Sequence, residues 1–314
     1  MDSFRWWSKE TVALVTGANK GIGFAIVKQL AKEGLTPILT SRNIQNGQRA
    51  SDMLREEGLY VMFHQLDVTD PDSISRLADW VKDKFGGIDI LINNAGIAYT
   101  TSPLSPDSME LAHSILETNY YGAKRVTEAM LPLFRHSSTP GNRIVNVSSM
   151  TGQLSVFRDE YWKKQLSSVD NLAEELINSF LQNCLLKIEE NLHRKSPGLE
   201  VIRADLPCPN SFVYYALSKA VLNAYSRMLA RDLSKRTKDQ KFYVNCICPG
   251  PTCTEMTLNS GHTPEEGADT AVWLALLPAS ECTTGKFYLK RKERSIEYIE
   301  ELFPILQAFL NKIK

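Results

Sequence analysis

Short runs of β-branched residues alternate along this chain with stretches of helical periodicity. The strand candidates are Val12–Thr16, Pro37–Thr40, Tyr60–Leu66, Ile88–Ile92, Arg143–Val147, Tyr243–Cys248 and Lys286–Leu289. The helix candidates are a segment with Ile22, Ile26, Val27, Leu30 and Ala31 on one face, followed by Ile44–Glu57, Asp72–Phe85, Asp107–Leu133, Phe212–Lys235, Pro264–Leu277 and Ile296–Asn311. This alternation is typical of repeated β-α-β units. We therefore expect an α/β fold with a doubly wound parallel sheet.

The length of the chain leaves a surplus to explain. At about 150 residues per domain, 314 residues suggest two domains, whereas one α/β domain of about 250 residues leaves about 64 over. Hydrophobic residues make up 43% of the chain, which is enough for a large core and excludes a disordered or collagen-like chain.

Charge and cysteine usage restrict the partners. The 36 basic and 36 acidic side chains cancel, so no overall field attracts nucleic acid or an anionic membrane. No stretch approaches the ~18 apolar residues of a membrane span, and the N-terminus lacks the apolar core of a signal peptide. The six cysteines include no C-x-x-C pair, and the five histidines lie far apart, so no metal site or disulfide framework is indicated. These features predict a cytoplasmic protein with reduced thiols that acts on small molecules.

The first chemical motif is the glycine-rich segment Thr16–Gly23, placed where the first strand turns into the first helix. Glycines at three of its positions permit a tight turn and let backbone N–H groups approach a pyrophosphate at the helix N-terminus. The segment lacks the Gly-Lys-Ser/Thr ending of a phosphate-binding NTPase loop. Alone it does not establish a nucleotide site, because a similar turn can simply connect a strand to a helix.

The end of the second strand indicates which dinucleotide is bound. NAD-specific units usually carry an acid there for the ribose 2′-hydroxyl, whereas this chain reads Leu39-Thr40-Ser41-Arg42-Asn43. Arg42 would pair with a 2′-phosphate, and Lys20 in the glycine turn would approach the same group. The alternative is that both are ordinary exposed loop residues. Two cations from separate elements favour NADP(H).

A Tyr-x-x-x-Lys pair, Tyr215 and Lys219, lies on a predicted helix. Residues four apart share a helix face, so the ammonium of Lys219 can lie near the phenol of Tyr215. A nearby cation favours the phenolate and eases proton donation, which suits the reduction of a carbonyl. By itself the pair is more often an exposed surface feature.

Together these motifs resemble the short-chain dehydrogenase/reductase family, and within it the monomeric carbonyl reductases, particularly their plant branch. The resemblance covers nearly the whole chain apart from one segment. Seven motifs occur in the family's order: Thr16–Gly23, Leu66-Asp67-Val68, Asn93-Asn94-Ala95-Gly96, Thr118-Asn119, Val147-Ser148-Ser149, Tyr215–Lys219, and Pro249-Gly250 followed by Thr254. The resemblance implies a single Rossmann-like domain over residues 1–314, with NADP(H) as cofactor.

The resemblance also implies residue roles. Ser149 would bond the substrate carbonyl, Tyr215 would donate the proton, Lys219 would bind the ribose and tune Tyr215, and Asn119 would anchor a water in the proton relay. Successive strand residues point to opposite faces, so only one of the adjacent serines can face the site, and the family pattern selects Ser149 over Ser148. Cofactor contacts are implied for Gly17, Asn19, Lys20, Gly21, Ile22, Gly23, Ser41, Arg42, Asp67, Val68, Asn94, Ala95, Gly96, Tyr215, Lys219, Pro249, Gly250, Thr252 and Thr254, and no metal is implied.

The chain departs from the simpler family members between Ser149 and Tyr215, where 65 residues intervene. Residues 155–205 are therefore predicted to form a helical insertion, because apolar residues at 172, 176, 177, 180, 181, 185, 188 and 192 follow a helical period. Resemblance to the monomeric branch suggests that the insertion covers a surface used elsewhere for oligomerisation, which predicts a monomer. Met150–Arg158, Leu206–Val213 and Thr252–His262 are expected to wall the substrate pocket, the last of them as a lid.

The predicted function is the NADPH-dependent reduction of a ketone or aldehyde of a small, largely apolar substrate such as a terpenoid or alkaloid, reversible as an alcohol dehydrogenase. A hydrolase is disfavoured because no G-x-S-x-G elbow surrounds Ser148 or Ser149. The alternative is an NADP(H)-binding sensor or interaction protein with no turnover, since a fold does not fix a function. A sensor has little need for all four catalytic positions, and all four are filled.

Overall fold

The predicted strands assemble into one eight-stranded sheet. The structure is a computed structural model that describes residues 5–98, 108–135, 141–193, 210–235, 240–257 and 259–297. The sheet order is β3-β2-β1-β4-β5-β6-β7-β8, and every pairing is parallel except the last, β7 with β8. The strands are β1 (Val12–Val15), β2 (Thr36–Ser41), β3 (Met62–Gln65), β4 (Ile90–Asn93), β5 (Asn142–Val147), β6 (Phe242–Cys248), β7 (Phe287–Leu289) and β8 (Lys292–Arg294). The expectation of a doubly wound α/β fold is confirmed.

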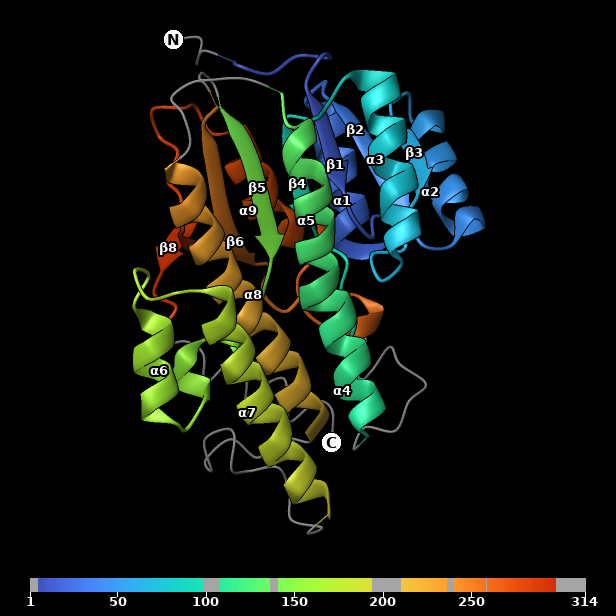
Figure 1. Ribbon diagram of the computed structural model, residues 1–314. Helices are drawn as coiled ribbons and strands as arrows, with labels where there is room; N and C mark the ends of the chain where they lie inside the picture. Colours follow the sequence, from blue (N-terminus) through green and yellow to red (C-terminus); the bar gives the residue numbers. More distant parts are fainter. Residues whose placement is uncertain are drawn as a thin grey trace.

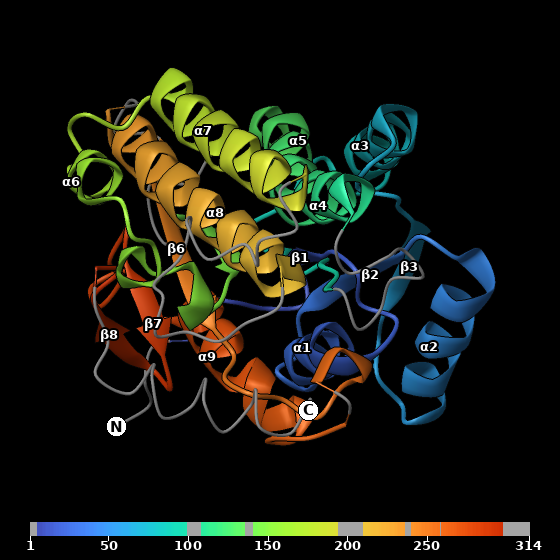
Figure 2. The same cartoon turned by 90° about the horizontal axis from the view of Figure 1, so that it is seen from below.

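Helices cover both faces of the sheet (Figure 1). They are α1 (Gly21–Lys32), α2 (Ile44–Glu56), α3 (Pro71–Phe85), α4 (Met109–Leu116), α5 (Ala123–Met130), α6 (Glu160–Ser167), α7 (Glu174–His193), α8 (Asn210–Ser234) and α9 (Pro264–Leu276). Figure 2 shows α3, α4, α5, α7 and α8 on one side of the sheet and α1, α2 and α9 on the other. Each face has its own apolar core, and strands such as β1 are buried along their whole length. Strands covered on both faces read as continuous apolar runs for this reason.

The strand order places a crevice between β1 and β4. The chain runs from β1 outward through β2 to β3, then returns to add β4 on the other side of β1. At such a reversal the loops after neighbouring strands diverge, and ligands bind outside the carboxyl ends of the strands.

The helix predicted as one segment over Asp107–Leu133 is broken in the middle. It consists of α4, a π-helical turn Glu117–Gly122, α5 and a 3₁₀ turn Leu131–Leu133. The π turn shifts the following residues around the helix axis, and such turns are frequent at functional sites. The prediction of continuous α-helix was wrong here because periodicity alone does not register one wider turn.

The last strand, β8, has no counterpart among the predicted elements. Lys290 and Arg291 join it to β7, and both adopt positive φ angles of 50° and 58°. Two such residues in succession form the turn that suits the twist of an antiparallel hairpin, although glycine or asparagine usually supplies them. The helix predicted over Ile296–Asn311 lies almost entirely outside the described residues, and Ile296 itself lies in a bend.

Two helices, α6 and α7, lie within the predicted insertion. The apolar stripe of α7 faces inward: Ile177, Phe180 and Ile188 are buried in the same core as α8. Leu172 is buried just before the helix, which begins at Glu174. The periodicity therefore found the correct face of α7 but not the separate helix α6.

Candidate active site

A cleft of about 710 Å³ opens at the carboxyl ends of the strands, beside the crevice between β1 and β4. All the residues predicted to contact a cofactor line it, and so do Ser149, Tyr215 and Lys219. Asn119 lies just behind the lining, with 1% of its surface exposed. A cleft of this size falls within the usual range for ligand sites.

The glycine turn closes one wall of the cleft. Gly17 and Gly21 adopt left-handed φ angles of 61° and 58°, which residues with side chains rarely adopt. Gly23 is required by space instead: a Cβ there would lie 2.4 Å from Asn94 Nδ2 and 2.7 Å from the Gly17 carbonyl oxygen. Asn94 Nδ2 donates to the carbonyls of Thr16 and Gly17, both at 3.0 Å. The turn is thus held against the segment that follows β4.

The N-terminus of α1 points its backbone N–H groups into this part of the cleft. Lys20 is the N-cap residue, yet its side chain makes no capping hydrogen bond, and the first turn carries no acidic residue. Helix N-termini carry a partial positive charge and unsatisfied donors. A bound phosphate would satisfy both, so this end of α1 suits a pyrophosphate.

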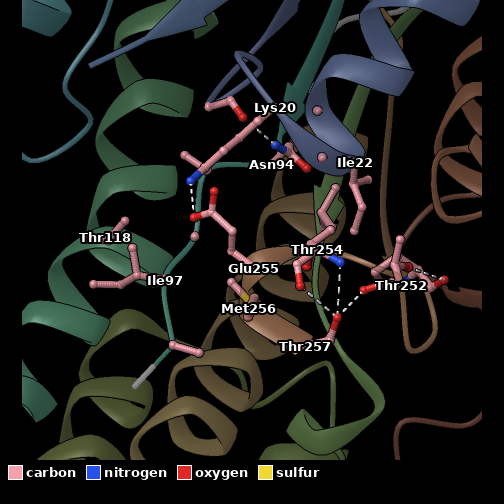
Figure 3. Close-up of a pocket in the computed structure, with 18 of the residues that line it drawn as sticks. Lys20, Ile22, Asn94, Ile97, Thr118, Thr252, Thr254, Glu255, Met256 and Thr257 are labelled. Carbon is pink, nitrogen blue, oxygen red and sulfur yellow. Dashed lines mark hydrogen bonds and ion pairs between the residues drawn. The ribbon is translucent and has the colours of Figure 1, made fainter. Parts of the chain in front are cut away.

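The outer end of the cleft is lined by Ser41, Arg42, Asn43 and Asn46, at the start of α2. Arg42 is exposed, and no ion pair among the described residues involves it. Lys20 is in a different state, because its ammonium pairs with the carboxylate of Glu255 across the mouth of the cleft (Figure 3). The sequence predicted two cations converging here, and the structure shows that one of them already has a carboxylate partner.

Asp67 and Val68 follow β3 at the same end of the cleft. The Asp67 carboxylate accepts hydrogen bonds from the backbone and hydroxyl of Thr69, at 2.9 and 2.7 Å, which fixes its orientation. Val68 packs against Gly122 in the π turn, where a Cβ would lie 2.7 Å from the valine side chain.

The segment after β6 forms the opposite wall. Thr252, Thr254 and Thr257 are joined by hydrogen bonds, with the Thr257 hydroxyl accepting from the Thr254 N–H at 3.1 Å (Figure 3). Thr252 also pairs with His262 in an isolated bridge, so the loop predicted as a lid is closed at its base. Glu255 lies on this loop, and its ion pair joins the loop to the glycine turn.

Asn119 connects three parts of the site. Its Oδ1 accepts from the Ile97 N–H at 2.8 Å, while Nδ2 donates to the Ile97 carbonyl at 3.0 Å and to the Ser218 hydroxyl at 3.1 Å. Gly96 lies beside it, where a Cβ would be 3.3 Å from Asn119 Oδ1 and 3.6 Å from Lys219 Nζ. The π turn therefore ties the segment after β4 to α8.

The adjacent serines point in opposite directions, as expected from strand geometry. Ser148 is buried, and its hydroxyl donates to the Lys219 carbonyl at 3.4 Å. Ser149 is half-buried in the cleft, and its hydroxyl is hydrogen-bonded to the phenol of Tyr215. The serine that faces the tyrosine is the one the family pattern selects.

Tyr215 and Lys219 lie one turn apart on α8, with Nζ 5.5 Å from the centre of the tyrosine ring. Burial raises the pKa of the Tyr215 phenol above its usual value, although the hydrogen bond from Ser149 opposes the rise. Burial lowers the pKa of Lys219 to about 8, and its Nζ donates to the Val147 carbonyl at 2.9 Å. At neutral pH the phenol of Tyr215 is therefore protonated, and the charged form of Lys219 beside it is less stable than that of an exposed lysine.

Known proteins resemble this chain over most of its length. The family described as short chain dehydrogenase matches residues 11–160. A (+)-neomenthol dehydrogenase from Arabidopsis thaliana is 39% identical, over 89% of this chain and 96% of the relative. The mouse (Mus musculus) protein named carbonyl reductase (NADPH) 1 is 35% identical, over 91% of this chain and 98% of its own. The solved structure of salutaridine reductase from Papaver somniferum has a TM-score of 0.73 and 38% identity, covering 88% of this chain and 99% of that one.

The chain belongs to the short-chain dehydrogenase family. Its structure adds residues to the site that sequence reasoning left without a role. Thr16 is buried, and its hydroxyl accepts from the N–H groups of Asn94 and Ala95, at 3.0 Å each. Ile97 also lines the cleft.

Some of these contributions left a signal in the sequence and others did not. Thr16 begins the glycine motif, so a role in holding the turn could have been inferred. Glu255 follows the motif threonine Thr254 directly, but nothing in the sequence indicates that it meets Lys20. Of the predicted substrate walls, Met150, Thr151 and Phe212 line the cleft, and so do residues 252–257 and Asn259 of the third wall. Residues 206–209 lie outside the described residues.

Proposed function

We propose that this short-chain dehydrogenase is an NADPH-dependent carbonyl reductase that reduces a ketone or aldehyde of a small, largely apolar substrate, and that works in reverse as an alcohol dehydrogenase. The observation that carries the proposal is the meeting of Ser149, Tyr215 and Lys219 at the inner end of a cleft whose outer end carries Arg42. Names of relatives support it, because they include a carbonyl reductase (NADPH) and a neomenthol dehydrogenase.

The residues present fit a phosphorylated dinucleotide. A Cβ at Gly17 would lie 2.8 Å from Ala95 Cα, so only glycine lets the turn pack this closely on the segment after β4, which leaves the start of α1 open to a pyrophosphate. Arg42 and the backbone at the start of α2 would hold a 2′-phosphate, and Asp67 and Val68 would hold the adenine. When bound, NADPH supplies the hydride.

The protein's own groups would manage charge and protons. As the carbonyl oxygen gains negative charge, Ser149 would donate a hydrogen bond to it and Tyr215 would transfer its phenolic proton to it. Lys219 would stabilise the phenolate left behind, because a cation close to a phenolate lowers its free energy. Asn119 would hold Ile97 in place relative to α8. It would also anchor the water through which Tyr215 recovers a proton.

The surroundings of α8 support a monomer, which we propose as the working state. Helix α7 packs its apolar face on α8, and α4 packs on α8 as well, so much of the helix that bears Tyr215 is covered within one chain. We also propose a cytoplasmic location. Five cysteines in the described part of the chain are free thiols, in keeping with a reducing compartment, and no helix there is long and apolar enough to cross a membrane.

The test follows NADPH oxidation spectroscopically against monoterpene ketones, alkaloid ketones, steroids, quinones and aliphatic aldehydes, with NADH as a control. We expect turnover of at least one class, a strong preference for NADPH, and loss of turnover in Tyr215→Phe with NADPH binding retained. Turnover by Tyr215→Phe at the wild-type rate would contradict the proposed role. NADPH binding without turnover across the panel would favour the sensor, and a dimer mass by light scattering would exclude the monomer.

A further inference from the structure

Thr151 lies two residues after Ser149, in the 3₁₀ turn Met150–Gly152. It is buried, it lines the cleft, and it makes two contacts with the same atom. Its backbone N–H donates to Ser149 Oγ at 3.2 Å, and its hydroxyl donates to Ser149 Oγ at 3.0 Å. One neighbour therefore supplies two donors to the serine oxygen.

A serine hydroxyl has one proton to donate and two lone pairs with which to accept. In this structure both acceptor positions of Ser149 are used by Thr151, which leaves only the O–H bond for other partners. Tyr215 and Cys248 line the cleft together with Ser149, and both interact with its side chain. The phenol oxygen and the thiol sulfur can each accept a hydrogen bond from the Ser149 hydroxyl until a substrate oxygen takes their place.

The turn that carries Thr151 is fixed relative to α8. A Cβ at Gly152 would lie 2.5 Å from the Lys219 carbonyl carbon, so the turn touches the helix backbone directly. Asn223, one turn further along α8, donates from Nδ2 to the Gly152 carbonyl at 3.1 Å. Because of these contacts, the Thr151 hydroxyl keeps its place between the serine and the helix that bears Tyr215.

We infer that Thr151 is a positioning residue for carbonyl reduction: it occupies both acceptor sites of Ser149 and so commits the serine proton to the substrate oxygen. The inference rests on the proposed function. A serine with a free acceptor site would accept the Tyr215 proton instead, and would turn the proton donor away from the substrate. Stabilisation of a developing oxyanion depends on donors that are oriented before the reaction begins.

The test compares Thr151→Val with Thr151→Ser. Valine keeps the shape of threonine but removes the hydroxyl, so we expect kcat to fall about 3- to 10-fold, the range that corresponds to one neutral hydrogen bond. The KM for NADPH should stay within about 2-fold, because Thr151 acts on the carbonyl end of the site, and Thr151→Ser should restore kcat to within about 2-fold of wild type. Thr270→Val is the matched control, since Thr270 is a buried threonine on α9, outside the cleft, whose hydroxyl accepts from the Arg291 N–H at 3.1 Å.

A double-mutant cycle separates positioning from simple packing. In a Ser149→Ala background the hydroxyl of Thr151 has no serine to orient, so adding Thr151→Val should change kcat by less than about 2-fold. If Thr151→Val lowers kcat equally in both backgrounds, or leaves the kcat of the wild type unchanged, the inference is overturned and the proposed function still stands. A wild-type protein that binds NADPH but turns over no carbonyl would overturn the inference together with the proposed function.

Discussion

Replacing Lys219 by methionine should abolish turnover and yet make the protein more stable. The lysine side chain is 3% exposed, and its Nζ makes one described hydrogen bond, to the Val147 carbonyl. Burial lowers the pKa of this lysine to about 8. Methionine has similar length and volume and carries no charge. The substitution therefore removes the free-energy penalty of burying the ammonium without leaving a large cavity.

The size of the gain follows from the pKa of Lys219. A drop from the usual value near 10.4 to about 8 costs roughly 3 kcal/mol of folding free energy at neutral pH, since a tenfold change is worth about 1.4 kcal/mol. Leaving the Val147 carbonyl without this donor costs about 1 kcal/mol. The net gain is about 2 kcal/mol, or roughly 3 °C in Tm for a chain of this size.

The stability gain should also depend on pH in one direction. Below about pH 8 the lysine is protonated in the folded and unfolded states, so the full penalty applies to the wild type. Between about pH 8 and pH 10.4 the folded state binds fewer protons than the unfolded state, and wild-type stability therefore rises with pH. The advantage of Lys219→Met should shrink over this interval and turn into a small disadvantage above it, because the missing hydrogen bond to Val147 then remains uncompensated.

Calorimetric or fluorescence-detected unfolding of both proteins at several pH values measures this gain directly. Lys235→Met serves as the control, because Lys235 directly follows α8 and its side chain is 68% exposed. Its Tm should change by less than about 1 °C, as is usual for surface substitutions. A Lys219→Met protein that is less stable than wild type at neutral pH, or whose Tm difference does not vary with pH, would refute the reasoning.

Two further predictions follow from the site. Gly23→Ala should weaken NADPH binding more than 10-fold (about 1.4 kcal/mol) and lower the Tm, because the new Cβ would overlap Asn94 Nδ2. Titration of NADPH fluorescence measures the affinity and thermal unfolding measures the Tm. An unchanged affinity would contradict the packing argument. The rate of alcohol oxidation should rise with pH while the rate of reduction is highest near neutrality, because burial raises the pKa of Tyr215 and oxidation needs its ionised form. Initial rates measured in both directions from about pH 6 to about pH 10 should diverge in this way. Two pH profiles that run parallel would contradict the role of Tyr215.

The regular part of the fold is predictable from the sequence because its physical causes are local. The first strand, the glycine turn and α1 follow from a β-branched run, glycines at fixed positions and a helical stripe, and the structure places them within one or two residues of the prediction. The π turn at Glu117–Gly122 has no local cause. It follows from tertiary contacts, in which Asn119 bonds Ile97 and Ser218, and no periodicity in the sequence records them.

The candidate site also has a part that the sequence predicts and a part that it does not. Tyr215 and Lys219 share a helix face by spacing alone, and the choice of Ser149 over Ser148 follows from strand alternation once the family pattern is known. The contacts of Thr151 with Ser149, and of Glu255 with Lys20, depend on how short irregular turns fold back after a strand. Such turns are fixed by hydrogen bonds rather than by hydrophobic periodicity, so the sequence gives little indication of them.

The hairpin that ends the sheet also bears on how copies of this chain meet. A strand at a sheet edge offers unpaired N–H and C=O groups to any strand that approaches. In β8 that strand is three residues long and consists of Lys292, Glu293 and Arg294. If two copies joined antiparallel about Glu293, the two glutamates would face each other and each Lys292 would face an Arg294. Every cross-strand pair would then bring like charges together, which is destabilising, so this edge opposes growth of the sheet from one molecule into the next.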